Sequence, residues 1–224
     1  MPGYYTEKLA AERLRACYDL APPRTRAYLE AEIEFVLGRT KPSMVALELG
    51  CGYGRVLERL LPAVHVAFGI DTSLASLRMA LEFVRGKPSL RLACMDAMYL
   101  GFPDRIFDLT LCVQNGICAF AVNQQQLFRE ALRVTRSGGL VLFSSYSAQF
   151  WEHRLQWFEI QSAHQLIGEI DRQATGNGVI VCKDGFRATT ADRTTFEKLA
   201  AGLGVTPRIS EVDSSSLFCE IVVP

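Results

Sequence analysis

Apolar residues follow one rhythm in the first forty positions and another from Met44 onward. Between residues 10 and 21 they repeat at helical spacing, Pro22-Pro23 interrupts the repeat, and the spacing resumes from Leu29 to Leu37, which predicts two helices. From Met44, short apolar runs of strand length alternate with helical segments. The pattern predicts strands at about 44–49, 64–71, 90–95, 107–114 and 140–146, and helices at about 54–61, 73–85 and 123–136.

Alternating strands and helices with short connections indicate a parallel sheet that is covered by helices on both faces. We therefore expect an α/β fold with a doubly wound, mostly parallel sheet. Gly138-Gly139 is interpreted as the end of the helix over 123–136, because glycine commonly follows a helix C-terminus.

The pattern changes again after Tyr146. Residues 148–167 are rich in aromatic side chains and predict a helix, and Gly176-Asn177-Gly178 separates two runs, 166–175 and 179–190, that we expect to pair as a β-hairpin. A helix at about 191–203 and strands at about 207–213 and 216–223 follow. The expected organisation is a single domain with an N-terminal helical cap (1–43), a ligand-binding core (44–147), an aromatic helix with a hairpin insertion (148–190), and a C-terminal helix and strands (191–224).

Charge and composition narrow the class of function. The 224 residues include 24 basic and 24 acidic side chains, so no basic excess favours a nucleic acid or an anionic membrane as a partner. No apolar run reaches the roughly 18 residues of a membrane-spanning helix, and the N-terminus lacks the apolar stretch of a signal peptide. The seven cysteines are widely spaced without a C-x-x-C pair, which favours reduced thiols, no metal site and a cytoplasmic location.

The most informative stretch is a buried-type strand that leads into Gly50, Gly52 and Gly54 and then directly into a helix. Glycines at such a turn let the backbone bend sharply and let a ligand approach without a Cβ in the way. The spacing departs from the G-x-G-x-x-G dinucleotide fingerprint, because the third glycine comes one residue early and Arg55 follows it. Glu48, two residues before the first glycine, would repel a phosphate, so a ligand with a cationic end suits this turn better.

Polar residues also stand where the next three strands end. Asp71 follows the second strand, where a carboxylate can accept hydrogen bonds from both hydroxyls of a ribose, although it also suits the cap of the next helix. Asp96 stands at the end of the third strand and Asn115 at the end of the fourth. Open α/β sheets bind ligands at this edge, so we expect the three side chains to face one site.

These residues resemble the class I, Rossmann-like S-adenosylmethionine-dependent methyltransferases. The first motif of that family, an acidic residue followed by G-x-G-x-G, is matched by Glu48-Leu-Gly50-Cys-Gly52-Tyr-Gly54, and residues 132–143 resemble its helix, glycine turn and fifth strand. The resemblance covers about residues 44–147 and implies a seven-stranded sheet with an antiparallel last strand.

The resemblance also implies S-adenosylmethionine as the cofactor, with S-adenosylhomocysteine as the product. The glycine loop would then enclose the methionyl part, Asp71 would take the ribose hydroxyls, Asp96-Ala97 would flank the adenine, and Asn115 would lie near the sulfonium. The implied cofactor-binding residues are Glu48, Gly50, Cys51, Gly52, Gly54, Asp71, Thr72, Asp96, Ala97 and Asn115.

The acceptor is expected to approach from outside the central sheet pattern, where both tryptophans and most tyrosines are found. Predicted substrate contacts are Tyr5, Tyr146 and Trp151, because members of the resembled family often close the pocket with an N-terminal helix and place substrate contacts after the fifth strand. No catalytic residue is identified; His153, in the aromatic segment, is the candidate for proton transfer.

A small-molecule acceptor is favoured, because the insertion is modest and aromatic and no basic surface is evident. Three alternatives stay open: a protein or RNA methyltransferase, a non-catalytic module that binds S-adenosylmethionine, and an NAD-dependent dehydrogenase. Against the first, the segment after the fourth strand, Gln114-Asn115-Gly116-Ile117, lacks the Asn-Pro-Pro-aromatic arrangement of many enzymes that methylate amide or base nitrogens.

Overall fold

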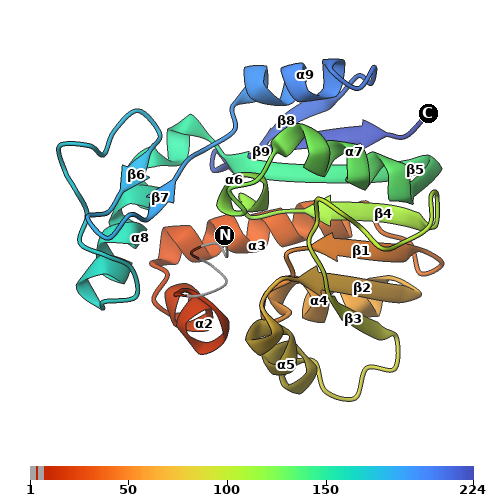
Figure 1. Cartoon of the computed structure of the whole chain (residues 1–224), viewed down its shortest axis with the longest axis horizontal. Coiled ribbons are helices and arrows are strands. Elements are labelled where there is room, and N and C mark those ends of the chain that lie inside the picture. Colours follow the sequence, from red (N-terminus) through yellow and green to blue (C-terminus); the bar gives the residue numbers. More distant parts are fainter. Residues whose placement is uncertain (1–3, 5–7) are drawn as a thin grey trace.

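The centre of the computed structural model, which describes residue 4 and residues 8–224, is a sheet of seven strands (Figure 1). The strands are Val45–Leu49 (β1), Val66–Asp71 (β2), Leu90–Cys94 (β3), Phe107–Cys112 (β4), Thr135–Tyr146 (β5), Arg208–Val212 (β8) and Ser216–Val222 (β9). Their spatial order is β3-β2-β1-β4-β5-β9-β8, and β9 runs antiparallel to both of its neighbours while the first five strands are parallel. The predicted fold class, a mostly parallel seven-stranded sheet with an antiparallel last strand, is confirmed.

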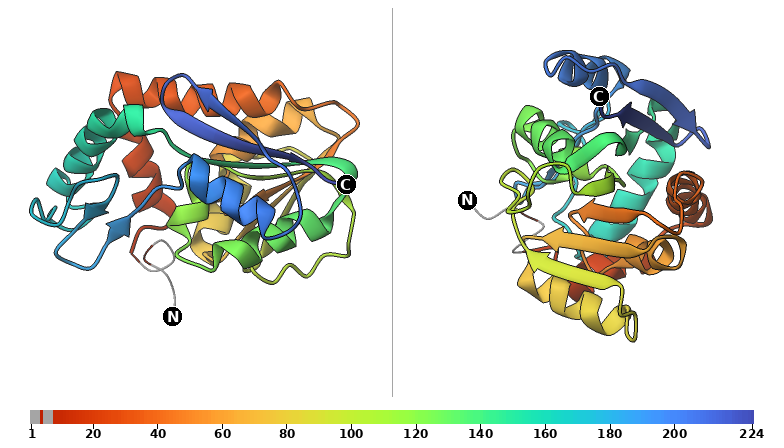
Figure 2. Two further views of the ribbon diagram at one scale, coloured as in Figure 1. Left: turned by 90° about the horizontal axis from the view of Figure 1, so that it is seen from above. Right: turned by 90° about the vertical axis from the view of Figure 1, so that its right-hand side faces the viewer.

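Helices cover both faces of this sheet (Figure 2). The helices described are Ala11–Asp19 (α2), Pro23–Leu37 (α3), Arg55–Leu60 (α4), Leu74–Phe83 (α5), Gly116–Ala119 (α6), Gln124–Val134 (α7), Trp151–Ala163 (α8) and Arg193–Ala201 (α9). One apolar cluster joins α7 and α9 to one face of the sheet, and a second joins α3, α4 and α5 to the other. None of these helices is long and apolar enough to cross a membrane.

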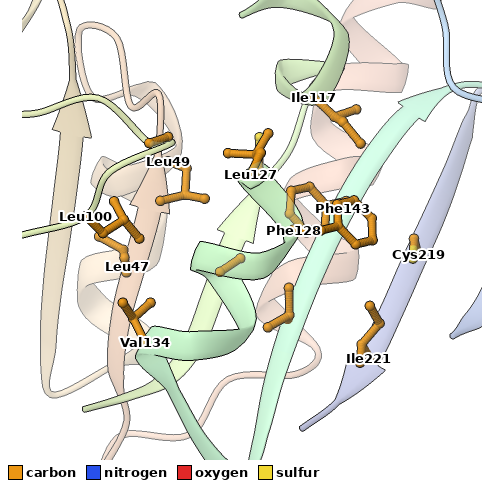
Figure 3. Packing of buried hydrophobic residues seen from close by; sticks show 14 of the residues in the cluster. Leu47, Leu49, Leu100, Ile117, Leu127, Phe128, Val134, Phe143, Cys219 and Ile221 are labelled. Carbon is orange, nitrogen blue, oxygen red and sulfur yellow. The ribbon is translucent and has the colours of Figure 1, made fainter. Parts of the chain in front are cut away.

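The two clusters explain why the central strands are apolar on both sides. On one face Phe128 of α7 stacks on Phe143 of β5 with ring centroids 4.1 Å apart, in the same cluster as Leu47 and Leu49 of β1 (Figure 3). Alternate strand residues such as Ala46 contribute to the cluster on the opposite face. Both faces are therefore covered mainly by apolar side chains, and the polar residues predicted for the site stand at the strand ends.

A third apolar cluster lies beyond the carboxyl end of β5. It joins α2 and α3 to α8 and to the short strands Ile180–Val181 (β6) and Arg187–Ala188 (β7). A single turn of 3-10 helix, Ala148–Phe150, connects β5 directly to α8. Figure 1 shows α2, α8, β6 and β7 gathered at one end of the sheet, so the N-terminal helices and the insertion together cover that end.

The expected role of Gly138-Gly139 is wrong. Helix α7 ends at Val134 and β5 begins at the next residue, so both glycines lie inside the strand. They pair with the end of the chain, since Gly138 N donates to Val223 O (2.8 Å) and Val223 N to Gly139 O (2.9 Å). Gly138 has a positive φ of 74°, and a Cβ on Gly139 would lie 3.0 Å from Asp108 O. An irregularity within the strand, rather than a helix end, therefore requires glycine at these positions.

The expected hairpin is only partly correct. The runs on either side of Gly176-Asn177-Gly178 do meet, through bridges between Ile170 and Cys182 and between Gly176 and Val179. The ladder itself joins β6 to β7 across a second turn at residues 182–186. Each strand has two residues, so the insertion is mainly loop, held in place by the packing of the third cluster.

Candidate cofactor and acceptor site

A cavity of about 1020 Å³ lies where the carboxyl ends of the central strands meet the N-terminal helices and the insertion. The strand order reverses between β1 and β4, and such a switch point opens a crevice in a doubly wound sheet. Nine of the predicted cofactor residues line this cavity: Glu48, Gly50, Cys51, Gly52, Asp71, Thr72, Asp96, Ala97 and Asn115. Gly54 does not, because it faces α5, where a Cβ would lie 3.0 Å from Val84 Cγ2.

The glycine turn after β1 takes the conformation that its sequence predicts. Gly50, Gly52 and Gly54 have φ values of 74°, 53° and 91°, a backbone conformation that residues with a Cβ rarely adopt. A Cβ on Gly50 would lie 2.2 Å from Phe120 Cζ, so this position has no room for a side chain. The turn is tied to β2, because Gly50 N and Cys51 N both donate to Ile70 O, at 2.8 and 2.9 Å.

Asp71 supports the same turn from the end of β2. Its Oδ2 accepts from Gly52 N at 2.9 Å, and its Oδ1 accepts from Ser73 N at 2.8 Å. Burial raises the pKa of the carboxyl group, while the backbone amides of Ser73, Gly52 and Thr72 oppose that shift. Each carboxylate oxygen can accept a further hydrogen bond, so the loop-holding role leaves capacity for a ligand hydroxyl.

Glu48 is the unusual acid of the site. The residue is 4 % exposed, and its Oε2 has no hydrogen-bond partner within the part of the chain that the structure describes. Burial raises the pKa of Glu48 to about 8, an effect that Arg55 opposes and Asp71 reinforces. An unpartnered buried carboxylate is costly unless something binds it, and a cationic group in the cavity would do so.

Two residues with positive φ follow β4, Gln114 at 56° and Asn115 at 62°. Gln114 N donates to Glu32 Oε2 (2.7 Å) and to Ser144 Oγ (2.8 Å), which fixes the bend. The side chain of Asn115 is engaged within the protein, because its Nδ2 donates to Thr189 O (3.0 Å) and its Oδ1 accepts from Ser145 Oγ (2.8 Å).

Gln114 is a lining residue that the sequence reasoning missed. Its Nε2 is buried and has no partner among the described residues, so it can donate to a ligand in the cavity. The sequence instead predicts the neighbouring Asn115 as a contact, because Asn115 stands at the expected end of the fourth strand. The backbone conformation, which no local sequence signal indicates, decides which of the two amides is free.

Aromatic side chains also line the cavity. Tyr146 lines it as predicted, together with Tyr18 of α2 and Trp157 and Phe158 of α8. Trp157 Nε1 donates to Cys17 O at 2.8 Å, which joins α8 to α2 across the cavity wall.

The other predicted acceptor-side residues lie elsewhere. Tyr5 lies outside the described residues. Trp151 is half-buried in the third apolar cluster and is absent from the described lining of the cavity. His153 is exposed, is likewise absent from that lining, and packs on the ring of Phe150 with centroids 5.6 Å apart. The difference is one of position along the helix, since Trp151 and His153 stand in the first turn of α8 and the cavity-lining residues Trp157 and Phe158 stand at least one turn further on.

Comparison with known proteins agrees with this geometry. Residues 47–143 match the family model of a methyltransferase domain. A 2-methyl-6-phytyl-1,4-hydroquinone methyltransferase of Synechocystis sp. is 28 % identical over 150 residues, covering 58 % of this chain and 46 % of that protein. A malonyl-[acyl-carrier protein] O-methyltransferase of Marinomonas sp. is 36 % identical over 110 residues, covering 46 % of this chain and 38 % of that protein. The chain thus spans less than half the length of the curated relatives that it matches.

A solved structure extends the likeness across nearly the whole chain. The N-methyltransferase NodS from Bradyrhizobium japonicum, in complex with S-adenosyl-L-homocysteine, has a TM-score of 0.64 and 16 % identity, covering 97 % of this chain and 95 % of that one. With the strand order and the glycine turn, these findings define the class: residues 47–143 match a methyltransferase domain, within a sheet that has the fold of the class I, Rossmann-like S-adenosylmethionine-dependent methyltransferases.

Proposed function

We propose that this protein transfers the methyl group of S-adenosylmethionine to a small-molecule acceptor. The observation that carries the proposal is the set of acids on one cavity, with Glu48 buried and unpartnered, Asp71 beside it and Asp96 at the next strand end. A ligand for this set needs a cationic group and several hydrogen-bond donors. S-adenosylmethionine has an ammonium and a sulfonium group, two ribose hydroxyls and an adenine amine, whereas the pyrophosphate of NAD would be repelled by Glu48.

The assigned contacts follow the chemistry of each side chain. The glycine turn surrounds the methionyl part, Asp71 accepts from the ribose hydroxyls, and Asp96-Ala97 borders the adenine. Asn115 lies near the reacting sulfur, where Gln114 Nε2 is the donor available to orient an oxygen or nitrogen lone pair of the acceptor.

The aromatic wall of Tyr18, Tyr146, Trp157 and Phe158 supports a small acceptor, because apolar walls with few polar groups are usual in small-ligand pockets. The two curated relatives also point to this class, since one is named for a hydroquinone and the other for a malonyl group on a carrier protein. The cytoplasmic location expected from the sequence stays a prediction.

The sulfonium supplies an activated methyl group, so the protein has to align the acceptor for in-line displacement and exclude water. In that displacement the cofactor would give its methyl group to a lone pair of the acceptor, with the carbon–sulfur bond broken and S-adenosylhomocysteine released. No side chain of the described cavity is assigned as a general base; one is needed only for an acceptor that is protonated at neutral pH.

The test has two parts, binding and transfer. Calorimetric titration of the purified protein with S-adenosylhomocysteine and with NAD should give saturable binding of the first only. Incubation with S-adenosylmethionine labelled at the methyl group, with fractionated small-molecule, protein and RNA extracts, should then place the label in the small-molecule fraction.

Each other outcome corrects a definite part of the proposal. Label in protein or RNA would overturn the acceptor class. Binding without transfer to any fraction would favour a non-catalytic binding module, and preferential binding of NAD would overturn the cofactor.

A further inference from the structure

The part of the cavity wall that α2, α8 and β7 form differs in charge from the strand ends. The acids Glu48, Asp71 and Asp96 stand at or just after the ends of the first three strands. Arg55 belongs to the glycine turn. Among the described lining residues that α2, α8 and β7 contribute, Arg187 of β7 is the only charged one. The wall on which the acceptor is placed is therefore aromatic, with one cation.

Arg187 is available to a ligand. The nearby Lys183, in the turn between β6 and β7, shows the ordinary arrangement, because it pairs with Glu169 at 2.6 Å. The side chain of Arg187, by contrast, makes no ion pair or hydrogen bond within the part of the chain that the structure describes. It is exposed and lines the cavity, so its guanidinium is hydrated and can exchange water for an anion that enters.

The two neighbours of Arg187 hold it beside the aromatic wall. Phe186 packs on Phe158 with ring centroids 5.9 Å apart. On the other side, Arg154 Nη2 donates to Ala188 O at 3.0 Å. Both contacts join β7 to α8, the helix that carries part of the wall (Figure 1). A molecule that binds to Arg187 inside the cavity thus lies against α8.

Gln161 of α8 adds an uncharged donor to this part of the cavity. It stands four residues after Trp157, so the two side chains share one face of the helix. Gln161 is 3 % exposed and lines the cavity, and no hydrogen bond of its side chain is found among the described residues. A buried amide without a partner is costly, so a ligand that accepts from it is favoured.

The two donors indicate which anion fits. One guanidinium and one neutral amide suit a carboxylate, which carries a single charge and can accept from both groups. A phosphate monoester carries about −1.5 to −2 charges at pH 7, so a single arginine would leave much of its charge uncompensated. The cavity has room for a second ligand, because its volume of about 1020 Å³ is at the top of the range of roughly 300–1,000 Å³ for small-ligand pockets.

We propose that the methyl acceptor is an amphipathic carboxylate, with an apolar body that packs on the aromatic wall and a carboxylate that Arg187 and Gln161 bind. The inference rests on the proposed function and deepens it, because it names the chemical class of the acceptor. Arg187 is then a specificity-determining residue. It selects acceptors that carry a carboxylate and contributes nothing to the binding of the cofactor.

Activity-guided fractionation tests the class on the acceptor itself. A small-molecule extract is separated at pH 8 on an anion exchanger and then on a reversed-phase column, and every fraction is incubated with wild-type protein and methyl-labelled S-adenosylmethionine. Both columns should retain the compound that takes up label, because it has a negative charge and an apolar body. An acceptor that passes through the anion exchanger would overturn the inference and leave the proposed function standing.

A pair of variants connects this acceptor to Arg187. Arg187→Gln should raise the KM for the accepting fraction by about three- to tenfold with little change in kcat, because it removes a charged donor that remains in contact with solvent. Lys183→Gln is the matched control, since Lys183 is exposed and lies outside the described cavity lining. It should keep the wild-type KM. All three proteins should bind S-adenosylhomocysteine equally in calorimetry, which shows an intact fold.

Salt separates an effect of charge from a structural one. With the wild type and Lys183→Gln, KM should rise from low to high NaCl concentration, because salt screens exposed charges. With Arg187→Gln it should change little.

The outcomes distinguish this inference from the proposed function. If no small-molecule fraction takes up label, the proposed function fails, and this inference fails with it. If an anionic fraction takes up label but Arg187→Gln and Lys183→Gln have the same KM and salt dependence, the assignment of Arg187 is overturned and the proposed function stands. The same holds if Arg187→Gln weakens S-adenosylhomocysteine binding as much as it raises KM.

Discussion

Asp71 combines a structural and a ligand-binding role at the residue scale. Because its carboxylate already accepts from Gly52 N and Ser73 N, a ribose would bind to an acid that the loop holds in position. We expect Asp71→Ala to weaken the affinity for S-adenosylhomocysteine by about tenfold or more, since hydrogen bonds to a charged group are worth roughly 1.5–3 kcal/mol. Calorimetry on the variant measures this loss.

Two comparisons show whether the Asp71 effect is specific. Asp104→Ala is the matched control, because the Asp104 side chain is 69 % exposed and pairs with Arg133 outside the cavity lining. Asp71→Asn keeps one acceptor oxygen and should lose less affinity than Asp71→Ala. Equal affinity in the wild type and Asp71→Ala would remove Asp71 from the ligand contacts.

Gly52 tests the close approach of a ligand to the glycine turn. Its φ of 53° strains any branched residue, and a Cβ would point toward the cavity, 3.1 Å from Leu14 Cδ2. We expect Gly52→Val to abolish binding of S-adenosylhomocysteine. Calorimetry should be accompanied by circular dichroism to show that the fold persists.

Gly86 offers a control for backbone strain alone, since its φ is 73° and a Cβ there meets nothing within 4 Å. Both valine variants should lose similar stability, about 1–3 kcal/mol for an unfavourable backbone conformation. Gly86→Val should still bind the ligand. Retained binding in Gly52→Val would show that the ligand does not approach this loop.

The predicted cofactor residues that line the cavity share one property, which is a place at or just after the end of a strand. The positions of Glu48, Gly52 and Asp71 at the cavity follow from local sequence, because a parallel sheet brings the carboxyl ends of its strands to one edge. Tyr18 and Trp157 belong to helices that meet only in the folded chain. The hydrogen bond from Trp157 Nε1 to Cys17 O joins these two helices. Sequence could mark them as candidates but could not choose between Trp157 and Trp151.

At the scale of elements, the predicted boundary between α7 and β5 is wrong because pairing with distant strands overrides the local sequence signal. Gly138-Gly139 has the composition of a helix end, yet its backbone pairs with the end of β9 next to a shift of register between β4 and β5. Thr135 begins the strand because its hydroxyl is satisfied in the core, by donation to Ala131 O at 2.7 Å and by a hydrogen bond with Thr110 Oγ1 at 2.7 Å. Val223 and Thr110 both lie outside residues 123–139, so that segment alone could not indicate either contact.

Helix α8 allows a measurement of its own, because the protein has two tryptophans and the helix carries both. Trp157 lines the cavity and Trp151 does not. We expect Trp151→Phe, which leaves Trp157 as the one tryptophan, to show a change of fluorescence when S-adenosylhomocysteine or an acceptor enters. Trp157→Phe should show little change, and it should lower methyl transfer more than cofactor affinity because it loosens the wall between α8 and α2.

The opposite pattern, with the fluorescence response kept in Trp157→Phe and lost in Trp151→Phe, would assign the acceptor wall to the first turn of α8. Equal loss of turnover and cofactor affinity in Trp157→Phe would mean that the residue only stabilises the fold.

At the scale of the molecule, one buried acid connects the N-terminal helices to the sheet. Glu32 of α3 accepts hydrogen bonds from Gln114 N (2.7 Å), Ser144 Oγ (2.9 Å) and Ser216 Oγ (2.6 Å), which belong to three different segments around the central strands. The N-terminal helices are therefore bonded to the segment that bends into the cavity. The sequence predicted these helices and that they cover the pocket. Contacts between residues so far apart along the chain, however, follow only from the complete fold.

Glu48 gives the molecule a stability that depends on pH. The charged and titratable groups that interact with it are Arg55, Asp71, Cys51, Cys112 and Tyr18, and burial dominates over the one cation among them. The pKa of Glu48 rises from 4.5 in the unfolded chain to about 8 in the folded protein. Between these values the folded state holds a proton that the unfolded state has released, so the contribution of Glu48 to stability falls as pH rises from about 5 to 8 and levels off above it.

We expect Glu48→Gln, which keeps the size of the side chain and removes the titrating proton, to relieve this loss. The melting temperature of the ligand-free variant should match that of the wild type near pH 5 and exceed it at pH 8.5, by roughly 2–4 °C for each kcal/mol of stability gained. The same variant should bind S-adenosylmethionine more weakly, because the ammonium group loses its carboxylate partner.

Glu32→Gln is the contrasting control. Burial also raises the pKa of Glu32, to about 7, but its carboxylate is satisfied by three donors, so the change should destabilise the protein at both pH values. Thermal melts of the three proteins at the two pH values decide the point, and a Glu48→Gln variant that is less stable at pH 8.5 and binds the cofactor normally would show that Glu48 is a structural acid without a ligand.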